Sequence, residues 1–426
     1  MSKIVITGGN RLEGDVLISG AKNAVLPIMA ATILNAGLNI IHHCPRLSDV
    51  EGSLNILEAL GCTVKREDDT VIVDSTTISK HNVPDHLMRE MRSSVIFLGS
   101  IIARCKQAVI STPGGCEIGP RPIDLHTNAL KKMGVHIEES HGFIHCSADR
   151  LKGAEIHLHS PSVGATENIM LTAVYAEGTT VIYNAAKEPE VMDLQLYLQE
   201  MGVRIRGAGT STIVIEGGCP LHEVEHTVIA DRIEAFTYLA AAALTRGSVR
   251  VQNVVPEHLY SAIAIMRECG LNIKIGKTDV SVTRHGILRP IKKIYTLPYP
   301  GFPTDMQAPM TAMLSIARGT SVVSETIFKN RFRYTDELTR MGADIHVEGQ
   351  AAVIRGVHKL TGAPVYSPDL RGGAALVIAA LAAEGETEVN DISHIERGYE
   401  EIVEKFAQLG ATIQKVETKD ENKQQT

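Results

Sequence analysis

Hydrophobic and polar positions follow a pattern that recurs six times along the chain. Each time an apolar helical stretch ends in a glycine, and alternating apolar and polar residues follow, as in T-V-I-V-D and T-I-V-I-E. The glycine is predicted to end the helix in a left-handed conformation, and the alternation predicts two half-buried strands. The six glycines lie 73, 68, 68, 72 and 68 residues apart, at Gly61, Gly134, Gly202, Gly270, Gly342 and Gly410. This regular spacing indicates a structural repeat of about seventy residues.

A glycine-led strand and a further apolar helix come before these helices, so the unit reads helix, strand, helix, strand, strand. Six copies divide into two groups of three, which predicts an α/β fold of two similar domains with a ligand cleft between them. The boundary lies near Ile229 to Arg232, and the strand Ile4 to Thr7 is expected to pair with the last copy. The predicted domains are residues 22–229, and residues 1–21 together with 230–417, followed by a polar tail at 418–426 that we expect to be disordered.

Composition, charge and cysteine spacing argue against several classes of function. The chain has 426 residues, 44% of them hydrophobic and 21% charged, and a net charge of −7. A nucleic-acid partner is therefore not expected, although a few clustered Lys and Arg can still hold a small anion. The first residues lack the pattern of a secretion signal and no apolar run is long enough to span a membrane, so we expect a cytoplasmic protein. Seven cysteines without C-x-x-C spacing argue for reduced thiols.

The segment Ser111 to Leu125 reads S-T-P-G-G-C-E-I-G-P-R-P-I-D-L and is the strongest candidate for chemistry. Its glycines and prolines predict a loop. Cys116 lies in the middle of this loop and Arg121 follows five residues later. A thiol in an exposed loop beside an arginine is in the setting that lowers a thiol pKa. The alternative is that Cys116 is one of seven ordinary thiols.

Three helix starts combine small or cationic residues that could bind an anion through free backbone N–H groups. Lys22 and Asn23 open an apolar helix in S-G-A-K-N, Met91 to Ser94 open another, and Ser162 to Thr166 open a third. The alternatives are a surface lysine at the first and ordinary helix caps at the other two.

Carboxylates and arginines near later helix starts form a second group of candidates. Asp305 follows two prolines and could act as a fixed base, or could cap the helix that starts near Met306. Asp369 to Gly372 and His394 to Gly398 each hold an arginine beside acidic residues, which suggests arginines converging on an anion, with surface ion pairing as the alternative. A metal site at the histidine pairs 42/43 and 157/159 is not favoured, because acidic and thiol ligands at suitable spacing are missing.

These motifs resemble the UDP-N-acetylglucosamine enolpyruvyl transferases. The likeness rests on P-G-G-C-x-I-G-x-R-P, S-G-A-K-N, S-V-G-A-T, F-P-T-D-M-Q, N-R-F, D-L-R and H-I-x-R-G-Y, in order along nearly the whole chain. It implies two domains of three βαβαββ units each, like inverted α/β barrels, with the active site in the cleft between them. It also implies cytoplasmic transfer of the enolpyruvyl group of phosphoenolpyruvate to the 3′-hydroxyl of UDP-N-acetylglucosamine, with release of phosphate, for peptidoglycan synthesis. No cofactor, metal, nucleic acid, membrane or obligate protein partner is expected.

The resemblance also assigns roles to residues. Cys116 is expected to be the general acid, able to form an adduct with phosphoenolpyruvate, on a loop that closes as a lid, and Asp305 the base. Lys22 and Arg397 are also expected to be catalytic, forming with Arg121 a clamp on the phosphate. The substrate-binding residues implied are Lys22, Asn23, Arg92, Arg121, Pro122, Ile123, Asp124, Leu125, Ser162, Val163, Gly164, Asp305, Ile327, Asp369, Arg371 (near the carboxylate) and Arg397.

Two departures from the family pattern stand out. Ser160 and Pro161 replace a lysine that some relatives carry before S-V-G, which could remove a contact to nucleotide phosphates. Gly372 and Gly373 follow D-L-R, and two glycines are expected to loosen that helix start. The alternative functions are transfer to shikimate 3-phosphate, against which the Cys116 loop argues, and a non-catalytic protein that binds a UDP-sugar.

Overall fold

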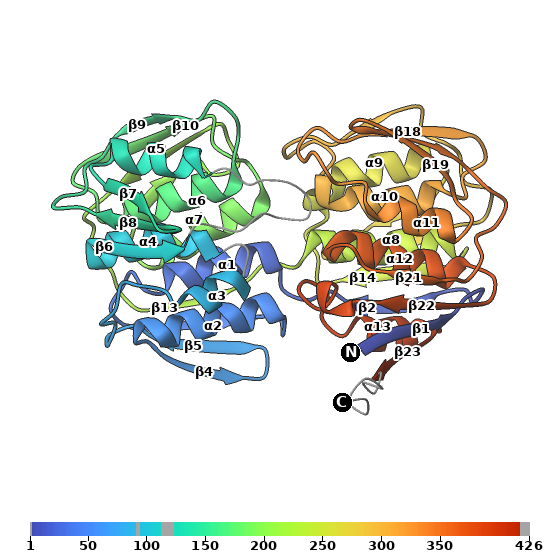
Figure 1. Ribbon diagram of the computed structural model, residues 1–426, viewed down its shortest axis with the longest axis horizontal. Helices are drawn as coiled ribbons and strands as arrows, with labels where there is room; N and C mark the ends of the chain where they lie inside the picture. Colours follow the sequence, from blue (N-terminus) through green and yellow to red (C-terminus); the bar gives the residue numbers. More distant parts are fainter. Residues whose placement is uncertain (1, 91–93, 112–122, 418–426) are drawn as a thin grey trace. The chain divides into compact units, whose positions relative to one another are not determined.

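The computed structural model describes residues 2–90, 94–111 and 123–417. These residues form two compact units. The N-terminal unit holds the described residues between 20 and 229, and the C-terminal unit holds residues 2–19 and 230–417. Each unit is drawn in Figure 1 as helices wrapped by small sheets. None of the described helices is long and apolar enough to cross a membrane.

The N-terminal unit contains three copies of the repeat. The first has α1 (Lys22–Ala31), β3 (Leu38–His42), α2 (Ser48–Leu60), β4 (Thr63–Glu67) and β5 (Thr70–Asp74). The second has α3 (Asp85–Glu90), η1 (Ser94–Ile96), α4 (Phe97–Cys105), β6 (Gln107–Ser111), α5 (Asp124–Lys132), β7 (His136–Ser140) and β8 (Phe143–Ser147). The third has β9 (Glu155–His157), α6 (Val163–Ala173), β10 (Thr179–Tyr183), α7 (Pro189–Glu200), β11 (Arg204–Arg206) and β12 (Thr212–Glu216), and β13 (Val224–Thr227) follows.

The C-terminal unit contains the other three copies. It begins with β1 (Ser2–Thr7) and β2 (Glu13–Leu17) and resumes with α8 (Arg232–Leu244), β14 (Ser248–Gln252), η2 (Pro256–Leu259), α9 (Tyr260–Glu268), β15 (Asn272–Ile275) and β16 (Asp279–Thr283). The fifth copy has β17 (Ile294–Tyr295), η3 (Thr304–Met306), α10 (Gln307–Leu314), β18 (Thr320–Ser324), α11 (Tyr334–Arg340), β19 (Asp344–Glu348) and β20 (Ala351–Arg355). The sixth has β21 (Pro364–Tyr366), α12 (Leu370–Ala382), β22 (Glu386–Asn390), η4 (Ile392–His394), α13 (Ile402–Gln408) and β23 (Thr412–Glu417).

The copies share one strand topology. In the third copy β9 pairs parallel with β10, and β10 and β11 each pair antiparallel with β12. The fifth copy repeats this order with β17, β18, β20 and β19. In these two copies the strand before the first helix completes a βαβαββ unit, whereas the described sheet of the second copy has only β6, β8 and β7. The predicted fold class is confirmed.

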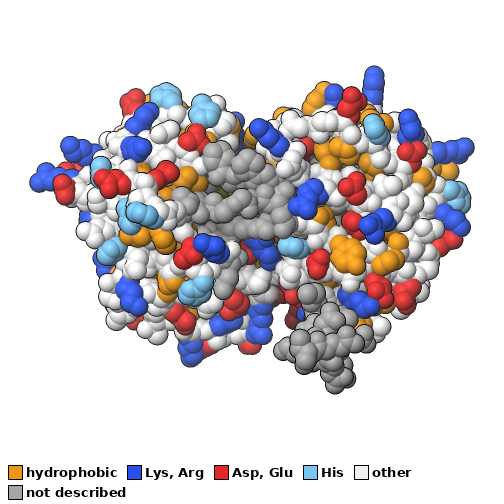
Figure 2. All heavy atoms as spheres, in the orientation of Figure 1, with side chains coloured by type: hydrophobic (Ala, Val, Ile, Leu, Met, Phe, Trp, Pro, Cys, Tyr) orange, Lys and Arg blue, Asp and Glu red, His pale blue; other side chains and the backbone are white. Residues whose placement is uncertain are grey.

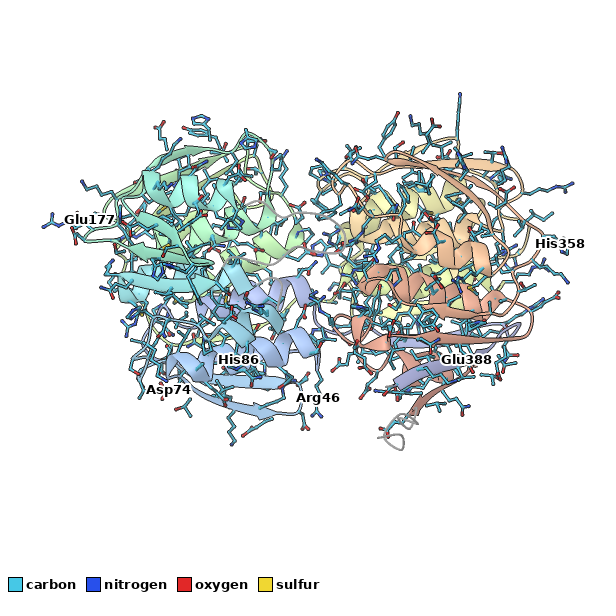
Figure 3. The ribbon with its side chains drawn as sticks, in the orientation of Figure 1. Arg46, Asp74, His86, Glu177, His358 and Glu388 are labelled. Carbon is cyan, nitrogen blue, oxygen red and sulfur yellow. The ribbon has the colours of Figure 1, made fainter. Side chains whose placement is uncertain are left out.

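Both units take a strand from a distant part of the chain. In the N-terminal unit β13 pairs parallel with β3, and in the C-terminal unit β2 pairs parallel with β14. Strand β1 lies between β22 and β23, antiparallel to both, as Figure 1 shows. Lys3 on β1 also pairs with Glu388 on β22 at 2.7 Å, and Glu388 is labelled in Figure 3. The predicted pairing of the first strand with the last copy is therefore confirmed.

One apolar helix of each copy lies inside its unit. In the C-terminal unit α8, α10 and α12 pack on one another, and every residue of α8 is buried. In the N-terminal unit α4 packs against α6 and α1. Helices that are buried on all sides are apolar on all sides, which explains why these segments show no polar stripe.

The six repeat glycines have the backbone conformation that the sequence predicts. Their φ angles range from 89° to 104°. Gly61 shows how the turn is made, since its N–H donates to the carbonyl of Glu58 at 2.9 Å at the end of α2. A side chain at this φ would be strained, so glycine recurs with the architecture.

The two glycines at the start of α12 do not loosen it, contrary to the expectation from the sequence. Asp369 caps the helix and accepts hydrogen bonds from the N–H groups of Arg371 and Gly372, each at 3.0 Å. A Cβ on Gly373 would lie 2.2 Å from Ser367 Oγ and 2.6 Å from Ile395 Cγ1. Glycine is present because neighbouring side chains occupy the space that a larger residue would need.

We therefore predict that Gly373→Ala lowers the free energy of unfolding by about 1–2 kcal/mol, because overpacking outweighs the better helix propensity of alanine. Urea denaturation measures this change. The matched control is Gly286→Ala, because a Cβ at Gly286 meets nothing within 4 Å. Equal stability of the two variants would contradict this packing argument.

His226 on β13 joins this returning strand to α7. Its Nδ1 lies 2.6 Å from Glu200 Oε2 and its Nε2 lies 3.2 Å from Asp193 Oδ1. Burial alone would lower the pKa of His226, but the hydrogen bonds and charges of Asp193 and Glu200 outweigh burial and raise it. A histidine whose folded-state pKa is raised stabilises the fold below its unfolded pKa of about 6.5, and loses that contribution as the pH rises through the folded value.

The variant His226→Gln should accordingly cost more stability at about pH 5.5 than at about pH 9. The measurement is the difference in unfolding free energy between wild type and variant at both pH values. His136→Gln is the control, because His136 makes an exposed pair with Glu138 and such pairs contribute little. A cost for His226→Gln that does not depend on pH would show that the charged pair is not responsible.

Candidate active site

Most of the predicted site residues that the structure describes lie at the starts of the inner helices. Lys22 and Asn23 are the first two residues of α1, as expected. Ser162 caps α6, where its side chain accepts a hydrogen bond from Ala165 N at 3.3 Å, and Val163 and Gly164 are the first residues of that helix. Free N–H groups at such starts favour anions.

Lys22 is not a surface lysine, so this alternative is wrong. Its Nζ lies 2.9 Å from Asp49 Oδ2 on α2, and the two side chains are 11% and 2% exposed. An ion pair this far from water fixes the position of the ammonium group. The Lys22 ammonium group is thus held in one orientation, while 11% of the side chain stays exposed.

The segment Ile123 to Leu125 leads into α5 and lies near the start of α6. Ile123 is the residue before the helix, Asp124 its first residue, and Leu125 is half-buried. The next residue, His126, is buried, and its Nδ1 lies 3.0 Å from Asn168 Nδ2 on α6.

His126 is a site residue that the sequence analysis missed. A Cβ on Gly164 would lie 3.1 Å from the Cε1 atom of this ring. Burial lowers the pKa of His126 to about 4, against the opposing effect of Asp124, so the ring is neutral near pH 7. The histidine therefore holds the 123–125 segment against the 162–164 helix start. The signal in the sequence that could have found His126 is its position directly after P-I-D-L, residues 122–125.

Cys116, Arg92, Arg121 and Pro122 lie outside the described residues. The other six cysteines can be compared with the prediction for Cys116. Burial raises the pKa of Cys62 and Cys269 to about 12 and that of Cys146 to about 11, and it also raises that of Cys105. These four thiols hold their protons too tightly to act as acids at neutral pH.

Asp305 in the C-terminal unit lies between two arginines. Its Oδ1 accepts from Arg331 Nη2 at 2.7 Å, and its Oδ2 accepts from Arg371 Nη2 at 3.3 Å. The arginine side chains are 5% and 2% exposed, whereas that of Asp305 is 27% exposed. Asp305 does not cap η3 or α10, so the capping alternative is wrong. Two charged donors fix the carboxylate in position.

Arg371 is buried rather than on the surface, so the surface-pairing alternative is wrong for it. Its guanidinium carbon lies 5.4 Å from the centre of the Tyr399 ring, and the Tyr399 hydroxyl lies 2.9 Å from Thr237 Oγ1 on α8. Burial alone would lower the pKa of Arg371, but the charges of Tyr399, Asp305 and Asp231 outweigh burial and raise it. Asp231 caps α8, so polar residues from the starts of α8, α10 and α12 interact.

Arg331 and Asp369 add polar atoms to this cluster. Arg331 sits in the N-R-F motif but was not among the predicted site residues. Its Nε and the Oδ2 of Asp369 are buried, and neither has a hydrogen-bond partner among the described residues. Of the other predicted residues, Arg397 is half-buried in the turn before α13, and Ile327 is 42% exposed.

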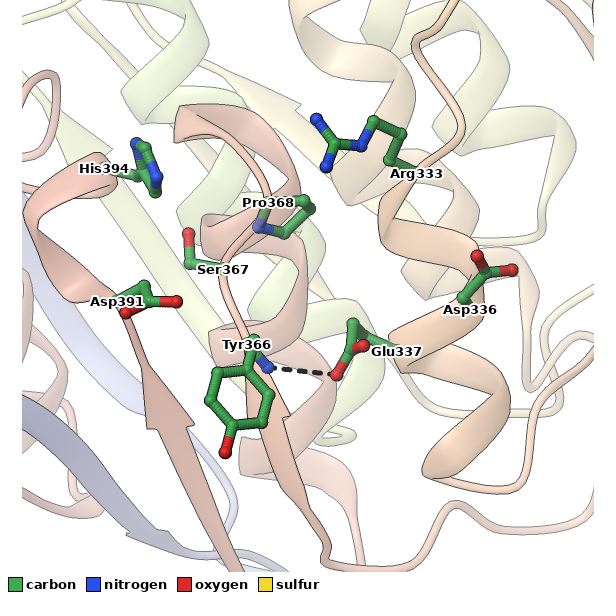
Figure 4. A pocket seen from close by; sticks show the side chains of 8 residues that line it. All are labelled: Arg333, Asp336, Glu337, Tyr366, Ser367, Pro368, Asp391 and His394. Atoms are coloured by element: carbon green, nitrogen blue, oxygen red, sulfur yellow. Dashed lines mark hydrogen bonds between the residues drawn. The ribbon is translucent and has the colours of Figure 1, made fainter. Parts of the chain in front are cut away.

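A cavity of about 390 Å³ lies beside the start of α12 and contains none of the predicted residues. Figure 4 shows its lining side chains, with the hydrogen bond of 3.0 Å between Tyr366 N and Glu337 Oε2. Both acidic and basic side chains line it: Arg333, Asp336, Glu337, Asp391 and His394. Because both kinds of charge line the cavity, its lining does not favour a ligand of one particular charge.

Comparison with known proteins identifies the family. The family model for EPSP synthase (3-phosphoshikimate 1-carboxyvinyltransferase) matches residues 6–406. A UDP-N-acetylglucosamine 1-carboxyvinyltransferase 2 from Caldanaerobacter subterraneus is 56% identical over 98% of this chain and 100% of the relative. A UDP-N-acetylglucosamine 1-carboxyvinyltransferase 1 from Symbiobacterium thermophilum is 50% identical over 97% and 95% of the two chains.

Solved structures agree with this result. The enolpyruvyl transferase NikO from Streptomyces tendae has a TM-score of 0.88 at 25% identity, covering 97% of this chain and 98% of that one. EPSP synthase from Acinetobacter baumannii has the same fold, with a TM-score of 0.75 at 18% identity over 98% and 100% of the chains. The chain belongs to the EPSP synthase family of 1-carboxyvinyltransferases, which are enzymes that transfer an enolpyruvyl group. The resemblance noted from the sequence motifs is confirmed.

The Asp305 cluster leads to a prediction about stability. Arg331→Met should lower the free energy of unfolding by about 2 kcal/mol, since it removes one partner of a largely buried pair. In a double-mutant cycle with Asp305→Asn the two effects should be non-additive by about 1 kcal/mol or more. Arg355→Met is the control, because Arg355 makes an exposed pair with Asp344 and should cost less than about 1 kcal/mol. Additive effects of Arg331→Met and Asp305→Asn would contradict the coupling.

Proposed function

We propose that this protein transfers the enolpyruvyl group of phosphoenolpyruvate to the 3′-hydroxyl of UDP-N-acetylglucosamine and releases phosphate. The proposal rests mainly on one relative, a UDP-N-acetylglucosamine 1-carboxyvinyltransferase 2 that is 56% identical to this chain over the relative's full length. The order and identity of the motifs around Lys22, Cys116, Asp305, Arg371 and Arg397 support it.

The proposed reaction is an addition followed by an elimination. The sugar hydroxyl oxygen bonds to C2 of phosphoenolpyruvate while C3 gains a proton and becomes a methyl group. Cys116 supplies that proton, and Asp305 receives the hydroxyl proton. The intermediate then returns one C3 proton to the Cys116 thiolate while the C2–O bond to phosphate breaks, so that phosphate leaves and the C2–C3 double bond of the enol ether forms. General acid and base groups each contribute about 10² to 10⁴ in rate.

The geometry around Asp305 supports its role as base. Arg331 and Arg371 hold both carboxylate oxygens, while about a quarter of the side chain stays exposed, at 27%. A base must be both oriented and reachable by the hydroxyl. Arg371 is also proposed to face the carboxylate of phosphoenolpyruvate, and Arg331 acts as a positioning residue.

Cations would stabilise the charge that develops as phosphate leaves. Lys22, Arg121 and Arg397 are proposed to surround the phosphate, because ammonium and guanidinium groups act strongly where water is excluded. The fixed Lys22 ammonium beside Asp49 supports this role. The Cys116 loop is proposed to close over the substrates as a lid.

The nucleotide sugar is proposed to contact residues of both units. Those of the N-terminal unit are Asn23, Arg92, Arg121, Pro122, Ile123, Asp124, Leu125, Ser162, Val163 and Gly164, and those of the C-terminal unit are Asp305, Ile327 and Asp369. The buried Oδ2 of Asp369 can accept a hydrogen bond from a sugar hydroxyl. His126 supports this set because it holds two of its segments together.

The reaction is proposed to be the first committed step of peptidoglycan precursor synthesis, in the cytoplasm, without a cofactor or obligate protein partner. It requires only the two substrates. The alternative acceptor, shikimate 3-phosphate, is suggested by the name of the matching family model. The Cys116 loop and the names of the full-length relatives favour the nucleotide sugar.

Acceptor specificity tests the proposal. Phosphate release from phosphoenolpyruvate should occur with UDP-N-acetylglucosamine and not with shikimate 3-phosphate, each offered in parallel to the same sample. Release only with shikimate 3-phosphate would assign the sister activity. Release with neither, from a folded sample that still binds UDP-N-acetylglucosamine, would support the non-catalytic alternative.

Replacement of the proposed acid tests the mechanism. Cys116→Ala should lower kcat by about 10² to 10⁴ while the thermal unfolding temperature stays the same. The control is Cys219→Ala, because Cys219 is a half-buried thiol that donates to the carbonyl of Glu216 at 3.3 Å. An unchanged kcat in Cys116→Ala would exclude this thiol as the acid.

A further inference from the structure

Three of the six residues that line a second cavity in the C-terminal unit are arginines. Its volume is about 300 Å³, and its lining is Arg11, Arg246, Arg284, His285, Gly286 and Ile287. Arg11 lies in the turn between β1 and β2, Arg246 in the turn between α8 and β14, and the others directly after β16. Three separate segments thus bring three guanidinium groups and an imidazole to one place.

The arginines of this cavity have no acidic partner among the described residues. Arg11, Arg246 and Arg284 form no ion pair with any residue in these ranges. By comparison, Arg250 on the adjoining β14 pairs with Asp15 on β2. The whole chain carries a net charge of −7. Three guanidinium groups without acidic partners give this cavity a positive charge that favours an anionic ligand.

The arginine turns are held in place before any ligand arrives. Ser248 N donates to Leu12 O at 2.9 Å, which ties the turn of Arg11 to the turn of Arg246. A Cβ on Gly247 would lie 2.1 Å from Leu12 O, so these two backbones are in close contact. Arg246 itself has a φ of 56°, a conformation that is uncommon for a residue other than glycine. The positions of both arginines are therefore set by the backbone.

Arg284 has a structural role as well. It is 8% exposed, and its guanidinium donates to Ala243 O and Gly286 O, each at 2.8 Å. It thereby covers carbonyl groups at the C-terminal end of α8, where a cation is favourable. Burial and then the positive charge of Arg246 lower the pKa of Arg284 to about 10, so the group remains charged at neutral pH. The hydrogen bonds to carbonyl groups explain why Arg284 lies at the end of α8. They do not explain why Arg11 and Arg246 line the same cavity.

We propose that this cavity binds a small phosphorylated anion through the guanidinium groups of Arg11, Arg246 and Arg284. Planar guanidinium forks match the oxygens of phosphate groups, and three of them would balance the charge of a diphosphate or a phosphate monoester. The volume suits a ligand of that size. The site lies at the C-terminal end of α8, whereas Asp231 caps its N-terminal end in the Asp305 cluster. It is therefore distinct from the proposed active site, and the inference does not depend on the proposed function.

Calorimetric titration of the full-length protein with inorganic pyrophosphate, and separately with inorganic phosphate, tests the proposal at constant ionic strength. The double variant Arg11→Ala/Arg246→Ala should bind at least one of these ions about tenfold or more weakly than wild type. Both side chains are exposed, so the variant should fold normally, as thermal unfolding can verify. The control Arg355→Ala removes an exposed arginine of the same unit and should leave binding unchanged.

Two further outcomes separate this site from the active site. Lys22→Ala should retain the binding that the double variant loses, and the double variant should keep the phosphate-release activity of wild type. The proposal is overturned if neither ion binds the wild type, if the double variant binds both as tightly as wild type, or if Lys22→Ala alone removes the binding.

Discussion

The ion pairs between Asp305 and the two arginines on either side of it are the interaction on which the C-terminal unit's half of the site depends. Arg371 is 2% exposed and lies at the start of α12, which packs against α8 and α10. Burying a guanidinium costs several kcal/mol unless its charge is balanced. Asp305, Asp231 and the Tyr399 ring provide that balance. The same contacts orient the carboxylate that we propose as the base.

This arrangement follows from the repeat. Each βαβαββ copy places one apolar helix inside its unit, and the starts of these helices are where polar groups can meet without disturbing the apolar core. In the C-terminal unit those starts carry Asp231, Asp305 and Asp369 with Arg371. In the N-terminal unit they carry Lys22 and the Ser162 cap. The architecture therefore repeats, while the residues at the helix starts differ and define the chemistry.

Much of the fold could be predicted from the sequence because its signals are local. A left-handed glycine such as Gly61 and an alternating strand such as Thr70–Asp74 are each set by neighbouring residues. The pairing of β1 with the last copy was also predictable, since that strand had no partner in the first copy. The extra strand contributed by β13 was not, because its pairing with β3 joins residues far apart in the chain.

The site was predicted less completely, for a related reason. Lys22 and Asp305 are marked by their motifs, but the pairing of Lys22 with Asp49 and of Asp305 with Arg331 is visible only in the structure, although Arg331 lies in the N-R-F motif. His126 acts through burial and its contact with Asn168, which no motif records. The glycines at 372 and 373 were expected to loosen α12. The sequence does not show that Ile395 and Tyr334, from other segments, fill part of the space beside them.

Identification of the product tests whether the enolpyruvyl group is transferred to the 3′-oxygen of UDP-N-acetylglucosamine. The protein would be incubated with phosphoenolpyruvate and UDP-N-acetylglucosamine in D₂O, and the nucleotide sugar analysed by mass spectrometry and NMR. We predict an enolpyruvyl ether on the 3′-oxygen, with deuterium in its methylene group because C3 gains and then loses a proton. An unmodified nucleotide sugar, an ether on another hydroxyl, or a methylene group without deuterium would contradict it.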